Sequence, residues 1–367
     1  MGLRLLHLIS SPDFTGPAEA VLDICDHLRI MGHDVEVICE SERSGDLRQM
    51  IVGQRLTSPL KLFLRNRPLP WQVWSDVRAL RTHLQSGAYD LVHCHFSHDH
   101  AVAAWAVRAL KRTALVRSSY HGRLTHQWLT PWLMRATRAM VFTSEADCRE
   151  FLAGYPHMPT LVSPPALHFE RWNSYGADLR HRLGLKPHHR VLAMVARFNA
   201  GRDQEALLEG FAAICGEFPD WRLVFFGRGE RLSHVRAKAQ TLQLQQQVLF
   251  GGYLTDDLAA GYRTSDWLYL GAPGHDGLGR AALEAMACGR AILTTAAAPI
   301  SEFVGRHQTG WIMPACTAAH LRQALTLASV EYTHERGAAA QKAVLNHCSL
   351  QARATRYASF YEELLHA

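Results

Sequence analysis

Two carboxylates, Asp276 and Glu284, stand eight residues apart in Gly271–Gly289 (GAPGHDGLGRAALEAMACG), which leads from a predicted strand through a loop into a predicted helix. Gly277 and Gly279 lie between them and would let a ligand approach the backbone, while the start of the helix offers free N–H groups to an anion. Glu284 could accept hydrogen bonds from a ribose diol, and Asp276 could do so from sugar hydroxyls. A surface acid plus a helix acid favoured by the macrodipole is the alternative interpretation.

The spacing of Asp276 and Glu284 also tests whether they could be the two catalytic carboxylates of a glycoside hydrolase. Eight residues of largely helical chain span roughly 12 Å at a rise of 1.5 Å per residue. Retaining glycosidases place their two carboxyls about 5 Å apart, and inverting ones up to about 9.5 Å apart. The spacing therefore argues against a glycoside hydrolase that uses this pair.

Two arginines share a second predicted strand end, Val195–Arg202 (VARFNAGR). Arg197 and Arg202 lie in a loop with Gly201, and guanidinium groups bind phosphate oxygens through paired N–H donors, so this edge suits a diphosphate. Ordinary surface basicity is the alternative. Gly16, in the first strand–turn–helix (SSPDFTGPAEA), is a single glycine and not a G-x-G-x-x-G fingerprint, so an NAD site is poorly supported and plain turn chemistry fits as well.

Four histidines crowd into residues 93–100 (HCHFSHDH), together with a cysteine and an aspartate. Strand alternation predicts that His93 and His95 share one face of a strand, and that His98 and His100 fall in the loop that follows. These are zinc-ligand types, but no second ligand pair at finger or H-E-x-x-H spacing accompanies them. A polar strand end that lines a cleft is the favoured interpretation over a metal site.

His121 follows the predicted strand Ala114–Ser118 and precedes Gly122, which suits a side chain that faces substrate, although a structural histidine fits as well. It belongs to a strongly basic block. Residues 55–144 hold 13 Lys and Arg against three acids, a net of +10, and because the whole chain is +6 the other 277 residues sum to −4. A local anionic partner is thus favoured over a generally cationic protein.

Within this block, Arg55–His83 mixes basic residues with aromatic and aliphatic ones. Such a mixture fits a surface attracted to anionic lipid. It would also fit nucleic acid, but no nucleic-acid-binding motif accompanies it. A helix pair with a buried apolar face and a solvated basic face is the third interpretation. The candidate acceptor or membrane face consists of Arg65, Arg67, Trp71, Trp74 and Arg123.

The elements that must position these residues alternate between short apolar strands and longer helical segments. With 367 residues, 48% of them hydrophobic, the chain is long enough for two domains. The alternation predicts two Rossmann-like units with parallel sheets, joined near residues 160–175, with ligands beyond the carboxyl ends of the strands. Strands are predicted over Leu3–Ile9, Val35–Cys39, Leu91–His95, Ala114–Ser118, Ala139–Thr143, Val191–Val195, Arg222–Phe226, Val248–Phe250, Trp267–Leu270 and Ala291–Thr294, and helices over Ala18–Met31, Asp203–Phe218, Leu232–Leu242, Arg280–Ala287 and Leu350–Leu365.

Composition points to a cytoplasmic enzyme. Eight scattered cysteines with no C-x-x-C pair are typical of reduced thiols. No stretch approaches 18 consecutive apolar residues, so no membrane span is expected. The opening LRLLHLIS has neither a basic n-region nor a cleavage site, which favours a first strand over a signal peptide.

In their order along the chain, these segments resemble the family-four GT-B glycosyltransferases, a retaining group that uses nucleotide sugars. DGLGRAALEAMACGR is similar to that family's E-G-F-G-x-x-x-x-E-A-M-A-x-G-x-P signature, and VARFNAGRDQEALLEGF to its G-R-L-x-x-x-K-G segment. GRGERL resembles the G-x-G-P loop, TSDWLYLGAP the A-D-V-x-x-x-P-S run, and ISEFVGRHQTGWIM the E-x-x-x-x-x-x-x-G segment. GPAEAVLDICDHLRIMGHDVEVI resembles the N-terminal G-G-A-E helix and G-H-E-V strand, so the resemblance covers both halves.

The resemblance implies an α/β fold of the GT-B type, with two facing Rossmann-like domains and a central cleft. The acceptor domain would span residues 1–165, with a C-terminal helix over 350–367 packing back on it. The nucleotide-sugar donor domain would span residues 170–349.

The resemblance also implies roles for single residues. His121 would lie near the transferred sugar, and Arg197 and Arg202 would hold the diphosphate and its developing charge without a metal. Glu284 would bind the ribose and Asp276 the donor sugar. The donor-binding set is completed by Gly16, which faces the donor phosphates, and by Gly227, Gly277, Leu278 and Gly279.

Three departures from the family pattern stand out. Asp276 replaces the usual first glutamate, Arg202 replaces the usual lysine, and PALH at residues 165–168 stands where an N-G-V-D motif is expected. Because none of these departures removes the groups that are expected to bind phosphate, we expect an active enzyme.

The expected activity is retaining, metal-independent hexosyl transfer from a nucleotide-diphosphate sugar to a glycan or lipid-linked acceptor, in cell-envelope polysaccharide or lipopolysaccharide synthesis. The alternatives are a nucleotide-sugar epimerase of the same fold and a non-catalytic nucleotide-sugar-binding protein. No cofactor, metal or nucleic acid is expected. The protein would be cytoplasmic, with peripheral contact to the anionic inner face of the membrane.

Overall fold

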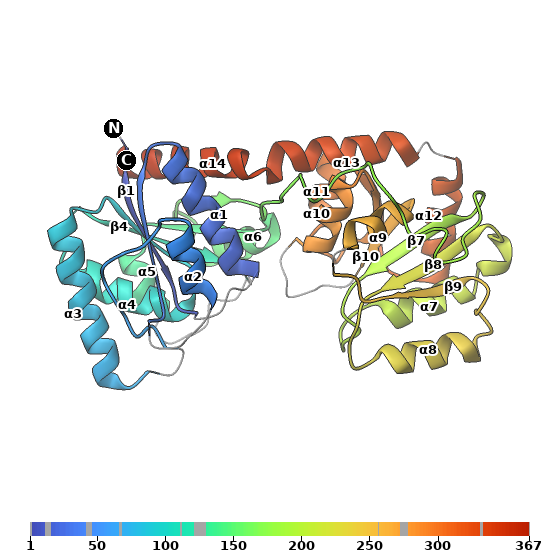
Figure 1. Cartoon of the computed structure of the whole chain (residues 1–367), viewed down its shortest axis with the longest axis horizontal. Coiled ribbons are helices and arrows are strands. Elements are labelled where there is room, and N and C mark those ends of the chain that lie inside the picture. Colours follow the sequence, from blue (N-terminus) through green and yellow to red (C-terminus); the bar gives the residue numbers. More distant parts are fainter. Residues whose placement is uncertain are drawn as a thin grey trace. The chain divides into compact units, whose positions relative to one another are not determined.

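The computed structural model describes residues 2–11, 16–41, 46–65, 68–110, 112–120, 130–255, 257–271, 278–330 and 333–366. They form two compact units (Figure 1). Unit 1 contains residues 1–166 and 350–367, and unit 2 contains residues 167–349. None of the helices in the described part of the chain is long and apolar enough to cross a membrane.

Unit 1 is built on a six-stranded parallel sheet with the order β2-β1-β3-β4-β5-β6. Along β1, Leu5 and Ile9 face one helical layer and Leu6 and Leu8 face the other, so both faces of the sheet are buried. The strands are β1 (Arg4–Ile9), β2 (Asp34–Cys39), β3 (Leu91–Cys94), β4 (Ala114–Ser119), β5 (Ala139–Phe142) and β6 (Thr160–Val162); the helices are α1 (Gly16–Ile30), α2 (Asp46–Gly53), α3 (Pro70–Gly87), α4 (Ser97–Val107), α5 (Thr130–Ala136), α6 (Glu145–Gly154) and α14 (Leu350–His366).

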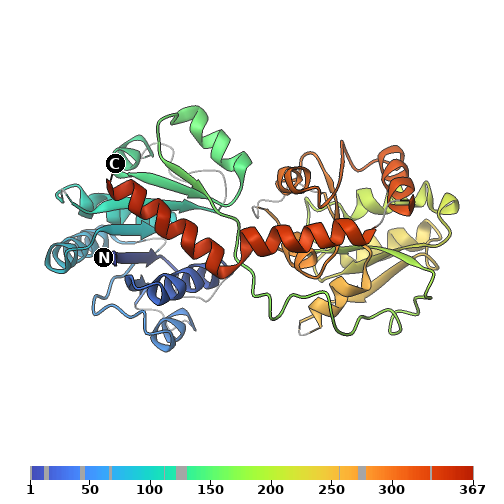
Figure 2. The same ribbon diagram turned by 90° about the horizontal axis from the view of Figure 1, so that it is seen from above.

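The last helix of the chain, α14, belongs to unit 1. It packs against α1, and its Tyr357 and Tyr361 are buried in the core on that face of the sheet (Figures 1 and 2). Arg353 is also buried on α14, and its guanidinium donates to Ser163 Oγ and to the Ala20 carbonyl. A buried cation with such partners fixes the helix to the unit.

Unit 2 repeats the architecture with the strand order β12-β11-β10-β7-β8-β9. Its two core layers lie on opposite faces of the sheet, one with α9, α10 and α13 and the other with α7, α8 and α12. The strands are β7 (Arg190–Val195), β8 (Trp221–Phe226), β9 (Val248–Gly252), β10 (Trp267–Leu270), β11 (Ala291–Thr295) and β12 (Gly310–Met313); the helices are α7 (Gln204–Ala212), η1 (Cys215–Glu217), α8 (Leu232–Thr241), α9 (Leu258–Thr264), α10 (Arg280–Ala287), α11 (Ser301–His307), α12 (Ala318–Val330) and α13 (Thr333–Cys348).

The predicted strands and the α/β class are confirmed, with ends that shift by no more than two residues. The helix predicted over Asp203–Phe218 is too long. It ends at Ala212 and is followed by a 3-10 turn over Cys215–Glu217, which Pro219 prevents from continuing as a helix. The edge strands β6 and β12 were not predicted, because they have only three and four residues and little period-2 pattern.

Each sheet has one place where the chain reverses its direction of travel. In unit 1 the chain adds β2 on one side of β1 and then crosses to β3 on the other side. In unit 2 it adds β8 and β9 beside β7 and then crosses to β10. Ligands of doubly wound sheets bind at the carboxyl ends of the strands at this switch point, which directs attention to the loops after β1, β3, β7 and β10.

Candidate functional site

The two predicted arginines follow β7, at the switch point of unit 2. Arg197 is exposed and Arg202 is partly buried. Their loop is held in place, because the buried Gln204 donates its side-chain N–H to the Arg197 carbonyl at 2.8 Å. The structure therefore presents one exposed and one partly buried arginine on a fixed backbone.

The loop after β8 packs tightly against the arginine loop. Phe198 donates its N–H to the Arg228 carbonyl at 3.0 Å. Gly227 has φ 144° and Gly229 has φ 156°. A Cβ on Gly227 would lie 2.0 Å from the Ala196 carbonyl oxygen. Gly227, which was predicted to bind the donor, is thus required first by the close approach of two backbones.

The loop after β10 enters α10 at Gly279, the N-cap residue, which has φ 75°. Leu278 is buried, and a Cβ on Gly279 would lie 2.4 Å from Leu270 Cδ2. Glycine at position 279 therefore allows the chain to enter α10 close to the Leu270 side chain of β10. The first N–H groups of α10 lie at the same edge of the sheet as the arginine loop.

Glu284, on α10, is 5% exposed, and its carboxylate accepts two hydrogen bonds. Tyr262 on α9 donates its hydroxyl to Oε2 at 2.7 Å, and Arg280 donates Nε–H to Oε1 at 2.8 Å. Burial raises the pKa of Glu284, while both donors act against this. Because a carboxylate offers about four lone-pair positions, the side chain retains acceptor capacity for a diol.

A second pairing was not predicted and ties β10 to the arginine loop. Tyr269 on β10 donates its hydroxyl to Asp203 Oδ2 at 3.0 Å, and burial raises the pKa of Tyr269. Asp203 directly follows Arg202 in the sequence, so this bond fixes the end of the arginine loop beside the switch point. Sequence periodicity carries no signal for such a long-range partner, whereas the i,i+4 spacing of Arg280 and Glu284 does predict their contact.

The histidine cluster differs from the prediction. His93 lies on β3 and His95 just after it, but both are buried, with exposed fractions of 0% and 3%, so the strand end does not line an open cleft. His98 and His100 lie in α4 and not in a loop. The helix begins there, and the Asp99 carboxylate in its first turn accepts the N–H of the N-cap residue Phe96 at 2.9 Å.

The basic and aromatic segment Arg55–His83 does not form the helix pair that was one of its three interpretations. Residues 55–65 form no second helix beside α3, but run along the edge strand β2 with bridges at Thr57 and Leu62. Trp71 and Trp74 on α3 are 57% and 65% exposed, so they belong to the surface and not to a core. Arg65 lies 4.0 Å from the buried carboxylate of Glu40.

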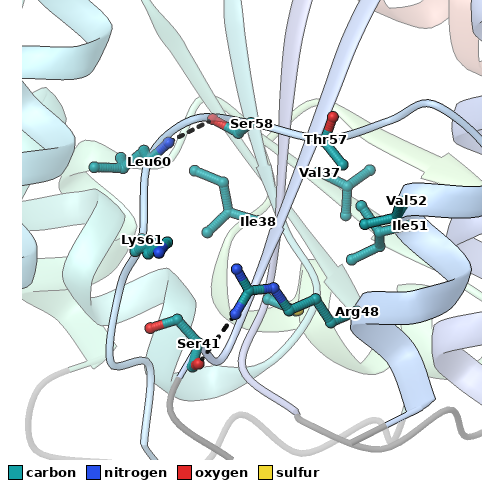
Figure 3. A pocket seen from close by; sticks show the side chains of 11 residues that line it. Val37, Ile38, Ser41, Arg48, Ile51, Val52, Thr57, Ser58, Leu60 and Lys61 are labelled. Atoms are coloured by element: carbon teal, nitrogen blue, oxygen red, sulfur yellow. Dashed lines mark hydrogen bonds between the residues drawn. The ribbon is translucent and has the colours of Figure 1, made fainter. Parts of the chain in front are cut away.

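A cavity of about 110 Å³ opens between β2, α2 and the segment that follows α2 (Figure 3). Its floor is apolar and includes Val37 and Ile51. Arg48 extends from α2 and donates to the Ser41 carbonyl at 3.4 Å, while Lys61 lies on the opposite side. The cavity therefore combines an apolar floor with two cations, and sequence analysis did not identify it.

The predicted site residues fall into three groups. The structure brings one group to the carboxyl edge of unit 2: Arg197, Arg202, Gly227, Leu278, Gly279 and Glu284. In unit 1, Gly16 is the first residue of α1, and Arg65, Trp71 and Trp74 lie near or on α3. His121, Asp276, Gly277, Arg67 and Arg123 lie outside the described residues.

Two family models match the chain and divide it in nearly the same place as the structure. "Glycosyltransferase Family 4" matches residues 14–171, and "Glycosyl transferases group 1" matches residues 177–342. The chain belongs to the group 1 glycosyltransferases. Its two parallel-sheet units are those of the GT-B fold of this family.

Individual relatives are distant. An alpha-monoglucosyldiacylglycerol synthase of Streptococcus pneumoniae is 27% identical over 116 residues, which are 32% of this chain and 26% of that protein. An N-acetyl-alpha-D-glucosaminyl L-malate synthase of Bacillus anthracis is 22% identical over 75% of each chain. The crystal structure of Anabaena HepE in complex with UDP superposes with a TM-score of 0.78 and 18% identity, covering 99% of this chain and 100% of that one. The last likeness shows the fold.

Proposed function

We propose that this glycosyltransferase is a retaining enzyme that moves a hexosyl group from a nucleotide-diphosphate sugar to a glycan or lipid-linked acceptor, in the synthesis of cell-envelope polysaccharide or lipopolysaccharide. One observation carries the proposal. Arg197, Arg202 and Glu284 stand on fixed backbone at the switch point of unit 2, where the sheet topology expects a ligand.

In the proposed mechanism, the ribose of the donor binds Glu284 and the diphosphate binds Arg197 and Arg202. As the bond between the sugar and the diphosphate breaks, negative charge develops on the departing phosphate oxygen. Two guanidinium groups near that oxygen stabilise the charge and need no metal ion. Asp276 binds hydroxyls of the donor sugar, and His121 acts near the transferred sugar.

The acceptor side of the proposal is supported by unit 1. Trp71 and Trp74 expose apolar surface on α3, and Arg78 lies over the Trp74 ring at 5.5 Å. The cavity beside β2 adds Arg48 and Lys61 above an apolar floor. Both features suit an anionic, partly apolar acceptor and peripheral contact with an anionic membrane at its cytoplasmic face.

Substitution of the arginines tests the donor assignment. Arg197→Ala and Arg202→Ala should each lower kcat by about 100-fold or more, the usual effect of removing one donor that stabilises developing charge. Arg322→Ala serves as the control, because this arginine is 45% exposed and pairs with Glu217 on the surface of unit 2. Unchanged turnover in both arginine variants would refute the diphosphate assignment.

The two alternatives predict other products. An epimerase would convert the free nucleotide sugar without an acceptor, and a binding protein would neither hydrolyse nor transfer the donor. Product analysis with a panel of nucleotide sugars, with and without lipid-linked acceptor, separates the three activities.

A further inference from the structure

Three buried imidazoles meet at the switch point of unit 1. His7 on β1 and His93 on β3 are paired in register, and His95 follows β3. Their exposed fractions are 0%, 0% and 3%. His7 Nδ1 lies 3.0 Å from His95 Nε2, and His95 Nδ1 lies 2.9 Å from the hydroxyl of Tyr120. A continuous hydrogen-bonded chain thus runs from the first strand of the sheet to Tyr120.

A second branch ties the same place to the C-terminal helix. His93 Nδ1 lies 2.6 Å from the hydroxyl of Tyr361 on α14, and His93 Nε2 lies 2.9 Å from Ser118 Oγ on β4. The rings of His93 and His95 stack with centroids 4.4 Å apart. The two branches are therefore packed against one another, and β1, β3, β4 and α14 all contribute to one network.

Hydrogen bonding accounts for this histidine network better than metal binding does. The ligand atoms of His7, His93 and His95 lie within 4.8 Å of one another, as a metal centre would require. However, five of the six ring nitrogens already face a protein partner, and the sixth, His7 Nε2, has none among the residues that the structure describes. The positive charges of Arg117 and Arg353 also act on His93 and His95, which disfavours a dication there.

We propose that His95 and Tyr120 are positioning residues for the transfer reaction, with His7 and the β1–β3 core as their support. Tyr120 directly follows β4, and the next residue in the sequence is His121, for which the proposed function assigns a place near the transferred sugar. The inference rests on that proposed function. Anchoring of the Tyr120 hydroxyl on His95 fixes the chain at the carboxyl end of β4.

The consequence for catalysis follows from geometry. If the Tyr120 hydroxyl is removed, His95 Nδ1 loses its partner inside the protein and the Tyr120 ring loses its anchor. A shift of about 1 Å in a group near the reacting atoms lowers the rate by roughly 100-fold, although donor binding in unit 2 is untouched. The expected signature is a lower kcat with an unchanged KM for the donor.

The structure offers a matched control. Tyr89 is also buried in unit 1, and its hydroxyl lies 2.8 Å from His83 Nε2, so that Tyr89→Phe and Tyr120→Phe each remove one tyrosine–histidine bond. Both variants should lower the thermal unfolding temperature. Only Tyr120→Phe should lower kcat, by about 10- to 100-fold, in nucleoside-diphosphate release from UDP-glucose, UDP-N-acetylglucosamine, GDP-mannose and ADP-glucose.

Two conservative variants of His95 supply a rescue test. In His95→Asn the amide lies near the former Nδ1 position and can still meet Tyr120, whereas in His95→Gln it lies near the former Nε2 position and meets His7. We expect His95→Asn to retain a clearly higher kcat than His95→Gln at a similar unfolding temperature. A purely structural role would not distinguish the two variants by rate.

The outcomes separate the inference from the proposed function on which it rests. A folded Tyr120→Phe variant with the same kcat as Tyr89→Phe, beside an active wild type, overturns the inference alone. A wild type that releases no nucleoside diphosphate from any of the four donors overturns the proposed function, and the inference with it. A selective loss of kcat in Tyr120→Phe, with donor KM preserved, supports the inference.

Discussion

Substitution of Glu284 by glutamine is the most direct probe of the proposed ribose contact. The carboxylate is 5% exposed, accepts from Tyr262 at 2.7 Å and from Arg280 at 2.8 Å, and would receive both ribose hydroxyls. Glutamine has nearly the same shape but offers only one oxygen and no charge. The variant should therefore fold while it loses most of its capacity to bind a diol.

Glu284→Gln should change the affinity for nucleotide much more than the stability of the fold. Hydrogen bonds to a charged group contribute about 1.5–3 kcal/mol each, and neutral ones about 0.5–1.5 kcal/mol. The change from two charged bonds to one neutral bond should weaken nucleotide binding by about 1.5–5.5 kcal/mol, roughly a 10- to 10,000-fold rise in Kd. The lost pair with Arg280, which is 44% exposed, costs the fold only a few tenths of a kcal/mol.

Calorimetric titration with UDP, GDP and ADP and with their 2′-deoxy and 3′-deoxy forms measures the effect. For the nucleotide that binds best, wild type should distinguish the ribose form from the deoxy forms, and Glu284→Gln should lose that distinction. Glu209→Gln, at a carboxylate that is 58% exposed on α7, is the control. Equal affinity of Glu284→Gln and wild type, or an unchanged preference for ribose, would refute the ribose assignment.

Three further predictions concern the loops, the buried histidines and the surface of unit 1. Gly227→Ala should destabilise unit 2 by about 1–3 kcal/mol, since its Cβ would meet the Ala196 carbonyl, whereas Gly216→Ala, which has open space, should be neutral in thermal unfolding. Burial lowers the pKa of His7 to about 3, so below pH 6.5 the unfolded chain binds a proton that the folded chain does not bind, and by pH 5 this group alone removes roughly 2 kcal/mol of stability. The lowered pKa values of His93, His95 and His100 act in the same direction, whereas the pKa of Asp99, raised to about 7, acts in the opposite direction. Denaturant unfolding at pH 7 and pH 5 should therefore show a smaller fall in the free energy of unfolding for His7→Asn than for wild type. Binding to phosphatidylglycerol vesicles should weaken with salt and fall about 10-fold or more in a Trp71→Ala, Trp74→Ala double variant but not in Tyr175→Ala, and binding that is absent at every salt concentration would reject the membrane face.

Sequence analysis located much of the carboxyl edge of unit 2 because its signals are local. A strand that ends in a loop with glycine or arginine, followed by a helix, reveals itself through periodicity over fewer than twenty residues, and Arg197, Gly279 and Glu284 were found in this way. Positive φ at Gly227 and Gly279 adds a physical reason that the pattern alone did not contain. Glycine is required there because two backbones, or a strand and a helix, approach closely.

The pairings that hold the site together could not be predicted, because they join residues that are far apart in sequence. Tyr262 bonds Glu284 across 22 residues, Tyr269 bonds Asp203 across 66, and His93 bonds Tyr361 across 268. No periodicity links such partners before the sheet order is known. The start of α4 is different, because Asp99 accepts the backbone N–H of Phe96 three residues earlier. An acid in the first turn of a helix is a local signal, and it was missed in favour of a loop.

The two switch points have opposite chemistry, although both lie at the carboxyl edge of a six-stranded parallel sheet. In unit 2 the edge presents an exposed guanidinium and helix N–H groups on backbone that glycine allows to pack closely. In unit 1 the strands meet at imidazoles that burial keeps neutral, each bonded to a neighbour. A dianionic phosphate needs cations that can reach it, whereas a sugar in transfer needs neutral groups that do not move. The proposed binding of the donor diphosphate therefore belongs to unit 2, and the proposed positioning role belongs to the neutral imidazole network of unit 1.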